Sequence, residues 1–148
     1  PEEAEAVAQM VRGLAEHIGT DFVPALTGET LRRSTGLIDV MVAEEGGRLL
    51  GACLGLMTFS TWRGAPGLYV VDLFVLPEAR GRNVGLELLR CQARRFAARG
   101  AQFIKLEVDE TNTGAERFYA RLGFGKKQED RLHILEQDRF VEFVGGQS

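Results

Sequence analysis

The sequence has few cysteines, prolines, histidines and tryptophans, and it has no long apolar run. Its 148 residues include two cysteines, four prolines, two histidines and one tryptophan. Cys53 and Cys91 have neither the spacing of a metal site nor enough companions for a disulfide framework, and both lie in apolar patterns. We therefore expect two buried thiols and no metal ion. Because no apolar run approaches the roughly 20 residues that span a membrane, we expect a cytoplasmic protein without a membrane partner.

Neither sign of charge dominates the chain. It has 18 lysines and arginines against 21 aspartates and glutamates, for a net charge of −3. A weakly acidic chain lacks the broad basic surface that binds nucleic acid, so we expect no nucleic-acid partner. The length fits one domain with its own core and is short for two, so we expect a single domain over residues 1–148.

A strand, a turn and a helix follow one another between residues 68 and 99. The apolar run 68–76 has strand composition, Pro77 ends it, and from Val84 the apolar residues recur at helical spacing. The turn, residues 80–85, holds two glycines, two arginines and an asparagine, but neither a P-loop nor a complete Gly-x-Gly-x-x-Gly. Glycine permits backbone angles that aim several N–H groups at one point, and the first helical turn adds unpaired donors. The turn is therefore a candidate phosphate site, although an exposed basic turn would have the same composition.

The rest of the chain alternates between helical and strand-like patterns. Residues 44–47 are typical of a tight hairpin connection. Thr113 with Glu116 fits a capping box that opens a short helix, and Gly123 fits the cap at its end. The other expected elements are helices over 3–18, 29–34, 84–99 and 137–144, and strands over 37–43, 48–60, 68–76, 102–108, 124–128 and 131–135.

Residues 112–124 carry a second motif, Asn-Thr-Gly-Ala-Glu-Arg-Phe-Tyr-Ala-Arg-Leu-Gly-Phe. Together with the turn at 80–85, it resembles the GNAT superfamily of acyl-CoA-dependent N-acyltransferases. The turn is similar to the family's Arg/Gln-x-x-Gly-x-Gly/Ala pyrophosphate loop, and the second motif to its Asn-x-x-Ala-x-x-Phe-Tyr-x-x-x-Gly-Phe signature. The closing segment and the run from Ser60 to Val75 look most like the diamine (spermidine/spermine) acetyltransferase branch.

The resemblance covers nearly the whole chain and implies its architecture. It implies an α/β GNAT fold, in which a mixed central β-sheet with splayed central strands is flanked by helices. It also implies a homodimer. Since the family has a first strand before this point and Pro1 is not a natural start, we expect that strand to precede residue 1.

The resemblance implies acetyl-CoA as the acyl donor. The turn would hold its pyrophosphate, N–H groups of the splayed strand would hold its pantetheine arm and carbonyl oxygen, and Asn112 would orient the arm or the loop. Asn83 stands where the family usually has its first glycine, and asparagine is the other residue that best tolerates left-handed backbone angles. The residues expected to bind the donor are Leu73, Phe74, Val75, Arg80, Gly81, Arg82, Asn83, Val84, Gly85, Leu86, Asn112, Ala115 and Phe118.

Tyr119 and Asp72 are the expected catalytic residues. The resemblance places the Tyr119 hydroxyl near the CoA sulfur, where it can donate to the departing thiolate; the alternative is a tyrosine packed in the core. An alkyl ammonium has a pKa of about 10.4, so the site must remove a proton before the amine can attack. Asp72 is the first candidate for this role and Glu107 the second, although Asp72 could instead be a structural carboxylate held by backbone donors. Val71 departs from the diamine branch, which has a glutamate there, so either Asp72 or a bound water takes that role or the acceptor is not a polyamine.

Trp62, Asp72 and Glu107 are the expected substrate-binding residues. Trp62 lies in a polar loop, where its ring either forms a wall for an ammonium group or packs against the core. We expect direct transfer of an acetyl group from acetyl-CoA to a primary amine of a small molecule, a polyamine or a lysine-like amino acid. The alternatives are peptide or protein N-acetylation, and an acyl-CoA-binding module without turnover.

Overall fold

The computed structural model describes residues 3–17, 24–127 and 129–146, and the chain forms two compact units, residues 1–112 and 113–148. In these described ranges no helix is both long and apolar enough to cross a membrane. The first unit contains α1 (Glu3–His17), α2 (Gly28–Arg33), β1 (Asp39–Glu45), β2 (Arg48–Ser60), β3 (Ala65–Val75), a short 3₁₀ helix (Pro77–Ala79), α3 (Val84–Ala97) and β4 (Ile104–Lys105). The second contains α4 (Thr113–Arg121) and α5 (Gln137–Gly145).

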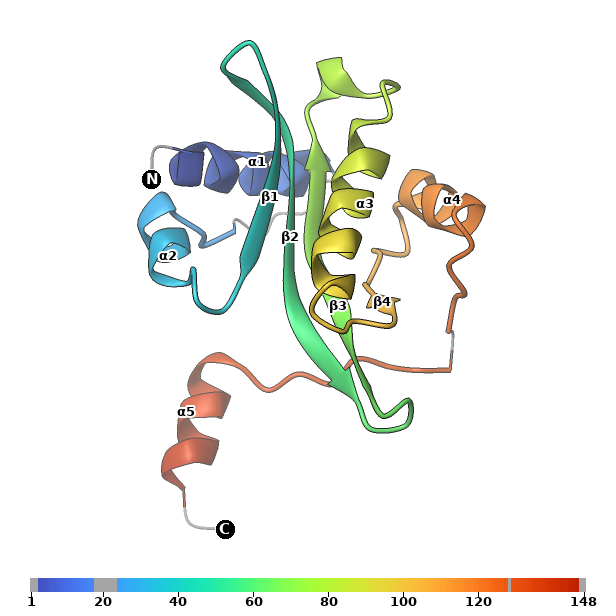
Figure 1. The fold of residues 1–148 in the computed structure, drawn as a ribbon. Helices are drawn as coiled ribbons and strands as arrows, with labels where there is room; N and C mark the ends of the chain where they lie inside the picture. The colour runs from blue at the N-terminus through green and yellow to red at the C-terminus, as the bar shows by residue number, and fades with distance from the viewer. Residues whose placement is uncertain (1–2, 18–23, 128, 147–148) are drawn as a thin grey trace. The chain divides into compact units, whose positions relative to one another are not determined.

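The first unit is built on a four-stranded sheet in the order β1-β2-β3-β4 (Figure 1). β2 is antiparallel to both β1 and β3, whereas β3 and β4 are parallel. This is the mixed sheet that the sequence predicts. Gly46 and Gly47 join β1 to β2 with φ angles of 58° and 79°, the left-handed angles that a two-residue hairpin needs. The parallel pair arises because α3 returns the chain to the same end of the sheet.

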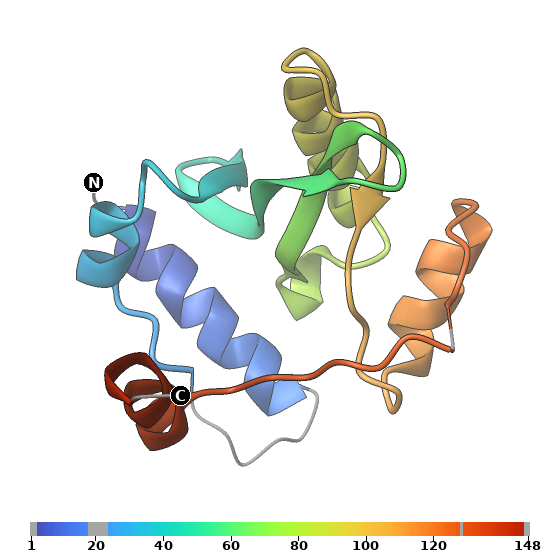
Figure 2. The same cartoon turned by 90° about the horizontal axis from the view of Figure 1, so that it is seen from below.

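Helices cover both faces of this sheet (Figure 2). α1 packs on one face and α3 on the other. On the α1 face, Val7 and Met10 of the helix pack with Ala52, Leu54 and Phe74 of the strands. These residues recur at helical spacing in α1 and at every second position in β2, so one side of each element faces this core. The other side of β2 is covered by α3, where Cys53 is buried.

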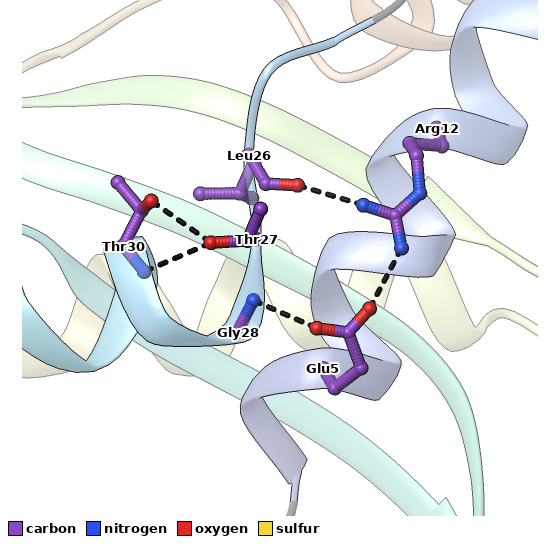
Figure 3. A network of polar contacts seen from close by, with 6 residues as sticks. All are labelled: Glu5, Arg12, Leu26, Thr27, Gly28 and Thr30. Atoms are coloured by element: carbon purple, nitrogen blue, oxygen red, sulfur yellow. Dashed lines mark hydrogen bonds and ion pairs between the residues drawn. The ribbon is translucent and has the colours of Figure 1, made fainter.

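A network of polar contacts joins α1 to α2 (Figure 3). Both carboxylate oxygens of Glu5 accept hydrogen bonds, one from Arg12 at 2.8 Å and one from the Gly28 N–H at 2.9 Å. Arg12 also donates to the Leu26 carbonyl oxygen at 2.7 Å. The pKa of Glu5 is lowered, first by the Gly28 backbone bond and then by the bond from Arg12. The two helices are therefore held together by charge-assisted bonds as well as by apolar packing.

The buried face of α3 corrects the prediction of two buried thiols. Cys53 is buried, and this burial raises its pKa to about 12, but Cys91 is exposed. Since a helix turns by about 100° per residue, Cys91 lies about 60° outside the arc of the buried residues. Gln92 is buried instead because its amide nitrogen donates to the carbonyl oxygens of Asp39 at 3.1 Å and Cys53 at 3.3 Å. The buried residues of α3 are Leu88, Leu89, Gln92 and Phe96.

Two predicted strand regions differ from the structure. β4 consists of Ile104 and Lys105 in place of the predicted strand over 102–108, because β3 and β4 diverge after two paired positions. Residues 124–127 and 129–136 contain no strand, so the hairpin predicted over 124–128 and 131–135 is wrong; residue 128 lies outside the described residues. An isolated two-stranded hairpin is marginal in water, and strand-like composition alone does not form one. The predicted terminal helix is confirmed as α5.

Candidate active site

The loop between β3 and α3 has the backbone that a phosphate site needs. Gly81 has a φ of 82° and Asn83 a φ of 62°, and α3 begins at Val84 as predicted. Asn83 thus adopts the left-handed angles at which glycine is more usual. α3 is 14 residues long, and the N–H groups of its first turn have no acceptor within the helix and lie at the positive end of its dipole. The loop can therefore hold an anion.

Both arginines of this loop contact neighbouring groups of the first unit. Arg80 donates through Nε to the Val75 carbonyl oxygen at 3.3 Å. Arg82 forms an ion pair with Glu45 at the end of β1, and both side chains are about half exposed. Because an exposed ion pair contributes little to stability, a bound phosphate can recruit Arg82 at low energetic cost.

β3 and β4 diverge beside this loop. In the part of the chain that the structure describes, they pair only at Leu68 with Ile104 and at Tyr69 with Lys105. Over residues 70–75, one edge of β3 therefore has no strand partner. This is the splayed arrangement that the resemblance implies.

Two backbone N–H groups of β3 face this open edge. Leu76 donates its N–H to the Leu50 carbonyl oxygen at 2.8 Å, which shows that its backbone faces β2. Because N–H groups alternate in direction along a strand, those of Leu73 and Val75 face away from β2. Phe74 faces β2, and its side chain lies in the core on the α1 face. Of the three strand residues expected to bind the donor, Leu73 and Val75 thus direct their N–H groups into the opening.

Asp72 lies at an irregularity of β3. The register with β2 shifts between Val70 and Asp72, which pairs with Leu54, so Val71 is the extra residue of a β-bulge. Asp72 shares the α1 face with Phe74, two residues further along the strand. Burial of its carboxyl group raises the pKa to about 6, which is the opposite of what backbone donors would do. A carboxylate with this pKa is suited to accept a proton near neutral pH.

Tyr69 joins the two diverging segments through its side chain. Its hydroxyl donates to Glu107 Oε1 at 2.8 Å. Burial, followed by the bond to Glu107 and the charges of Glu107 and Asp72, raises the pKa of Tyr69 to about 12, so the phenol keeps its proton. The sequence analysis missed this tyrosine. Its position in the strand, three residues before Asp72, was the one signal that pointed to it.

Trp62 does not lie with these carboxylates. Its side chain is 98% exposed in the loop between β2 and β3, so the alternative of packing against the core is wrong. Asp72 lies seven residues beyond Ala65, where β3 begins, which is about 23 Å at the rise of a strand. The structure thus brings Asp72 and Glu107 to one region around Tyr69 and leaves Trp62 at the far end of the hairpin.

The second unit carries Tyr119 on α4. Its ring packs edge-on against Phe118 and Phe124, with centroids 5.1 Å and 5.2 Å away. Gly123, with a φ of 95°, ends the helix as predicted. Ala115 lies four positions and Phe118 one position before Tyr119 in this helix. The two aromatic partners fix the orientation of the Tyr119 ring within its own unit.

Asn112 lies in the turn that precedes α4. Its N–H donates to the Asp109 carbonyl oxygen at 2.9 Å. The Thr111 hydroxyl and N–H donate to the Asp109 carboxylate at 2.5 Å and 2.8 Å, and these bonds lower the pKa of Asp109. The turn thus has a defined backbone at the end of the first unit.

The first unit also has a groove that lies apart from the two carboxylates. A groove of about 920 Å³ lies between α1 and the ends of β2 and β3, with Met10, Leu49 and Arg80 among its lining. Asp72 and Glu107 do not line this groove, so the groove does not contain the candidate catalytic carboxylates. In the part of the chain that is described, no group of three or more histidine, cysteine, aspartate or glutamate side chains could hold a metal ion.

The mixed sheet thus opens at its parallel pair, beside a loop and helix terminus that can hold a phosphate. Residues 13–124 match the acetyltransferase (GNAT) family model. Because this match spans most of the sequence, the chain belongs to the GNAT family and is an acetyl-CoA-dependent N-acetyltransferase.

The chain is also similar to individual proteins of this kind. It is 27% identical to thialysine N-epsilon-acetyltransferase of Bos taurus over 129 residues, which cover 79% of this chain and 75% of that protein. It is 34% identical to N-alpha-acetyltransferase 30 of Schizosaccharomyces pombe over 103 residues, which cover 67% of this chain and 66% of that protein. A crystal structure described as a "predicted acetyltransferase with acetyl-CoA" from Clostridium acetobutylicum matches with a TM-score of 0.75 at 14% identity, over 90% of this chain and 91% of that one. The structural likeness shows the fold alone.

Gly85→Ala is expected to weaken acetyl-CoA binding about tenfold without destabilising the fold. The only described atom that a Cβ at Gly85 would meet is Val75 Cγ2, at 3.5 Å, an ordinary contact. Alanine is better than glycine inside a helix by up to about 1 kcal/mol, so the protein alone gains stability. The new methyl group would instead meet a phosphate that approaches the first turn of α3. Calorimetric titration with acetyl-CoA and thermal unfolding measure the two effects.

The matched control for this prediction is Gly36→Ala. Gly36 lies in the turn before β1, and a Cβ there would meet no described atom within 4 Å. We expect its acetyl-CoA affinity to equal that of the wild type. An unchanged affinity in Gly85→Ala as well would show that the donor phosphates do not approach α3.

Proposed function

We propose that the protein transfers an acetyl group directly from acetyl-CoA to a primary amine of a small molecule, either a polyamine or a lysine-like amino acid. The observation that carries this proposal is the pair of carboxylates, Asp72 and Glu107, beside the opening between β3 and β4. The charges of both act on Tyr69, which places both within electrostatic reach of its ring. A protonated alkyl amine is attracted by such carboxylates.

The acetyl donor would be held by the loop and by the open edge of β3. The first-turn N–H groups of α3, with Arg80 and Arg82, are suited to the pyrophosphate. The N–H groups of Leu73 and Val75 can pair with the amides of the pantetheine arm as an added strand would. The donor supplies an activated thioester, whose carbonyl oxygen gains negative charge during the attack. A backbone N–H at the opening would stabilise that charge.

Asp72 would remove the proton that prevents the amine from attacking. An alkyl ammonium has a pKa of about 10.4, so only about one amine in 2,500 is neutral at pH 7. Asp72, with its pKa raised to about 6 by burial, is anionic at neutral pH and can take this proton directly or through one water. Val71 supplies no second carboxylate at the bulge, which makes Asp72 the acceptor on this strand.

Tyr119 would act on the other product of the reaction. The resemblance of residues 112–124 to the family signature supports a hydrogen bond from its hydroxyl to the departing thiolate. The reference pKa of a phenol, about 10, lies above that of a thiol, about 8.5, so full proton transfer is uphill. A hydrogen bond that stabilises the thiolate is therefore the role proposed for Tyr119.

The named relatives support two classes of acceptor. Thialysine is an amino acid with a primary amine at the end of its side chain, so the bovine relative supports a lysine-like acceptor. The relative named as an N-alpha-acetyltransferase supports the amino terminus of a peptide as a second candidate. An α-amine has a pKa of about 8, so it would depend less on a carboxylate base than an alkyl amine does.

Free-thiol release from acetyl-CoA distinguishes these acceptors. The panel contains polyamines, lysine and thialysine, aminoglycosides, and peptides with a free amino terminus. We expect kcat/KM for a polyamine or a lysine-like amine to exceed that for any peptide by about tenfold or more. Turnover confined to peptides would replace the small-molecule proposal with the second candidate.

A further inference from the structure

The Tyr69 side chain bridges β3 and the chain that follows β4 at the point where they separate. Tyr69 is the last residue of β3 that pairs with β4, and Glu107 lies two residues beyond its partner Lys105. The 2.8 Å hydrogen bond therefore spans the opening itself. Glu107 is exposed, and without this bond its side chain would sample several rotamers. The bond holds its carboxylate in one place.

Tyr69 also lies on the same face of β3 as Asp72. A Cβ on Gly55 would lie 2.6 Å from Leu68 Cδ1 and 3.5 Å from Gln92 Nε2, which shows that Leu68 faces α3. Because side chains alternate along a strand, Tyr69 faces the opposite side, where Asp72 also lies. Burial is the main cause of the raised pKa of Tyr69, but the charge of Asp72 adds to it. Glu107 and Asp72 thus both lie near the same phenol.

This arrangement gives the two carboxylates different tasks. Asp72 lies on a strand at the opening, about 7 Å along it from Tyr69, because the bulge places Asp72 only two ladder positions further on. Glu107 is exposed, and the Tyr69 hydroxyl bonds one of its oxygens, Oε1, which leaves Oε2 to accept a further donor. Two carboxylates near one opening can each attract one ammonium group of an acceptor that has two amines.

We infer that Tyr69 is a positioning residue, which holds the Glu107 carboxylate so that it binds the second, non-reacting ammonium of a diamine acceptor. Asp72 serves the amine that reacts. The inference rests on the proposed function and deepens it, because it names an acceptor with two amines. A monoamine has no second ammonium group, so its turnover should depend less on Tyr69 and Glu107 than that of a diamine does.

The test compares two acceptors of equal chain length, 1,5-diaminopentane and pentylamine. In Tyr69→Phe we expect the ratio of kcat/KM for the diamine to that for the monoamine to fall about fivefold, chiefly through KM for the diamine. In Glu107→Gln we expect a fall of about tenfold or more, because the charge itself is lost. In both variants we expect kcat/KM for pentylamine to fall less than kcat/KM for the diamine. The double variant should equal Glu107→Gln, because Tyr69 acts through Glu107.

Glu110→Gln is the matched control. It removes one exposed acidic charge from the same segment and does not touch Tyr69, so the ratio should not change. Equal losses for both acceptors in Tyr69→Phe would show that Tyr69 only supports the strands, and an unchanged ratio would show that Glu107 does not bind the second amine. Either result overturns the inference.

The proposed function and the inference fail in different ways. If the wild type acetylates neither these two amines nor any other small-molecule amine of the panel, the small-molecule proposal fails, and calorimetric titration of the CoA-bound protein with 1,5-diaminopentane decides the inference. Binding that is weakened about fivefold in Tyr69→Phe supports it. No binding to the wild type, or equal binding to both proteins, overturns it.

Discussion

Asp72→Asn is expected to lower kcat/KM for amine acetylation about a hundredfold, because a positioned general base contributes at least that factor. The wild type should also lose activity as the pH falls through about 6, where Asp72 takes up a proton. Asparagine cannot titrate, so this acidic limb of the pH profile should be absent in the variant. Thiol-release kinetics over a range of pH measure both effects.

The same substitution is expected to stabilise the fold at neutral pH. Burial raises the pKa of Asp72 from 3.8 in a model peptide to about 6. Below 3.8 the carboxyl group is neutral in both the folded and the unfolded chain, so it adds no pH-dependent difference between them. As the pH rises from 3.8 through about 6, the folded protein loses the stability that it gains by holding this proton more tightly than the unfolded chain. Above about pH 6 the Asp72 carboxylate is charged and buried, which destabilises the folded protein. Asparagine removes this cost, which we put at about 1–2 kcal/mol after allowing for partial exposure to solvent.

Urea unfolding of both proteins at about pH 4 and about pH 7.5 checks the sign of this effect. The advantage of the variant should be larger at the higher pH. Asp39→Asn is a useful contrast, because Asp39 pairs with Arg95 and Arg99 and its loss should destabilise the protein. A variant of Asp72 that is both fully active and less stable would show that this carboxylate is structural.

Tyr119→Phe is expected to lower kcat by about 10- to 100-fold, with KM for acetyl-CoA within about threefold of the wild type. The substitution removes only the hydroxyl, which is proposed to donate to the departing thiolate. The ring contacts with Phe118 and Phe124 are kept, so the loss of stability should be no more than the roughly 1 kcal/mol of one hydrogen bond. Steady-state kinetics and thermal unfolding of the same preparation measure both.

Phe124→Leu is the control for this prediction. It removes the ring that packs 5.2 Å from Tyr119 and keeps the hydroxyl. We expect a loss of stability of about 1 kcal/mol and a kcat within about threefold of the wild type. If Tyr119→Phe retains full kcat, the hydroxyl takes no part in the reaction and the tyrosine is only a packing residue.

Local features were predictable because they depend on neighbours in sequence. The start of α3 at Val84, the cap at Gly123 and the hairpin at 44–47 follow from glycine conformations, capping residues and apolar periodicity. Asn83 was expected to tolerate left-handed angles, and it adopts them. The two family motifs lie in such local segments, which is why the family could be identified before the structure was known.

Features that depend on partners distant in the chain were not predictable in this way. Cys91 was expected to be buried, but the face that α3 turns to the sheet is set by carbonyl oxygens of β1 and β2 that accept from Gln92. The hairpin predicted near the C-terminus failed because a strand needs a partner as well as the right composition.

The order of the elements up to α4, the backbone of the phosphate loop and the GNAT family follow from the sequence, because short-range sterics and motif spacing specify them. That β4 ends after Lys105, that Asp72 is buried enough to raise its pKa to about 6, and that Tyr69 bonds Glu107 depend on the assembled fold. Tyr69 and Glu107 are 38 positions apart in the chain, and they meet only where β3 packs beside the segment after β4. No local pattern encodes such contacts, because they form only when the sheet has assembled.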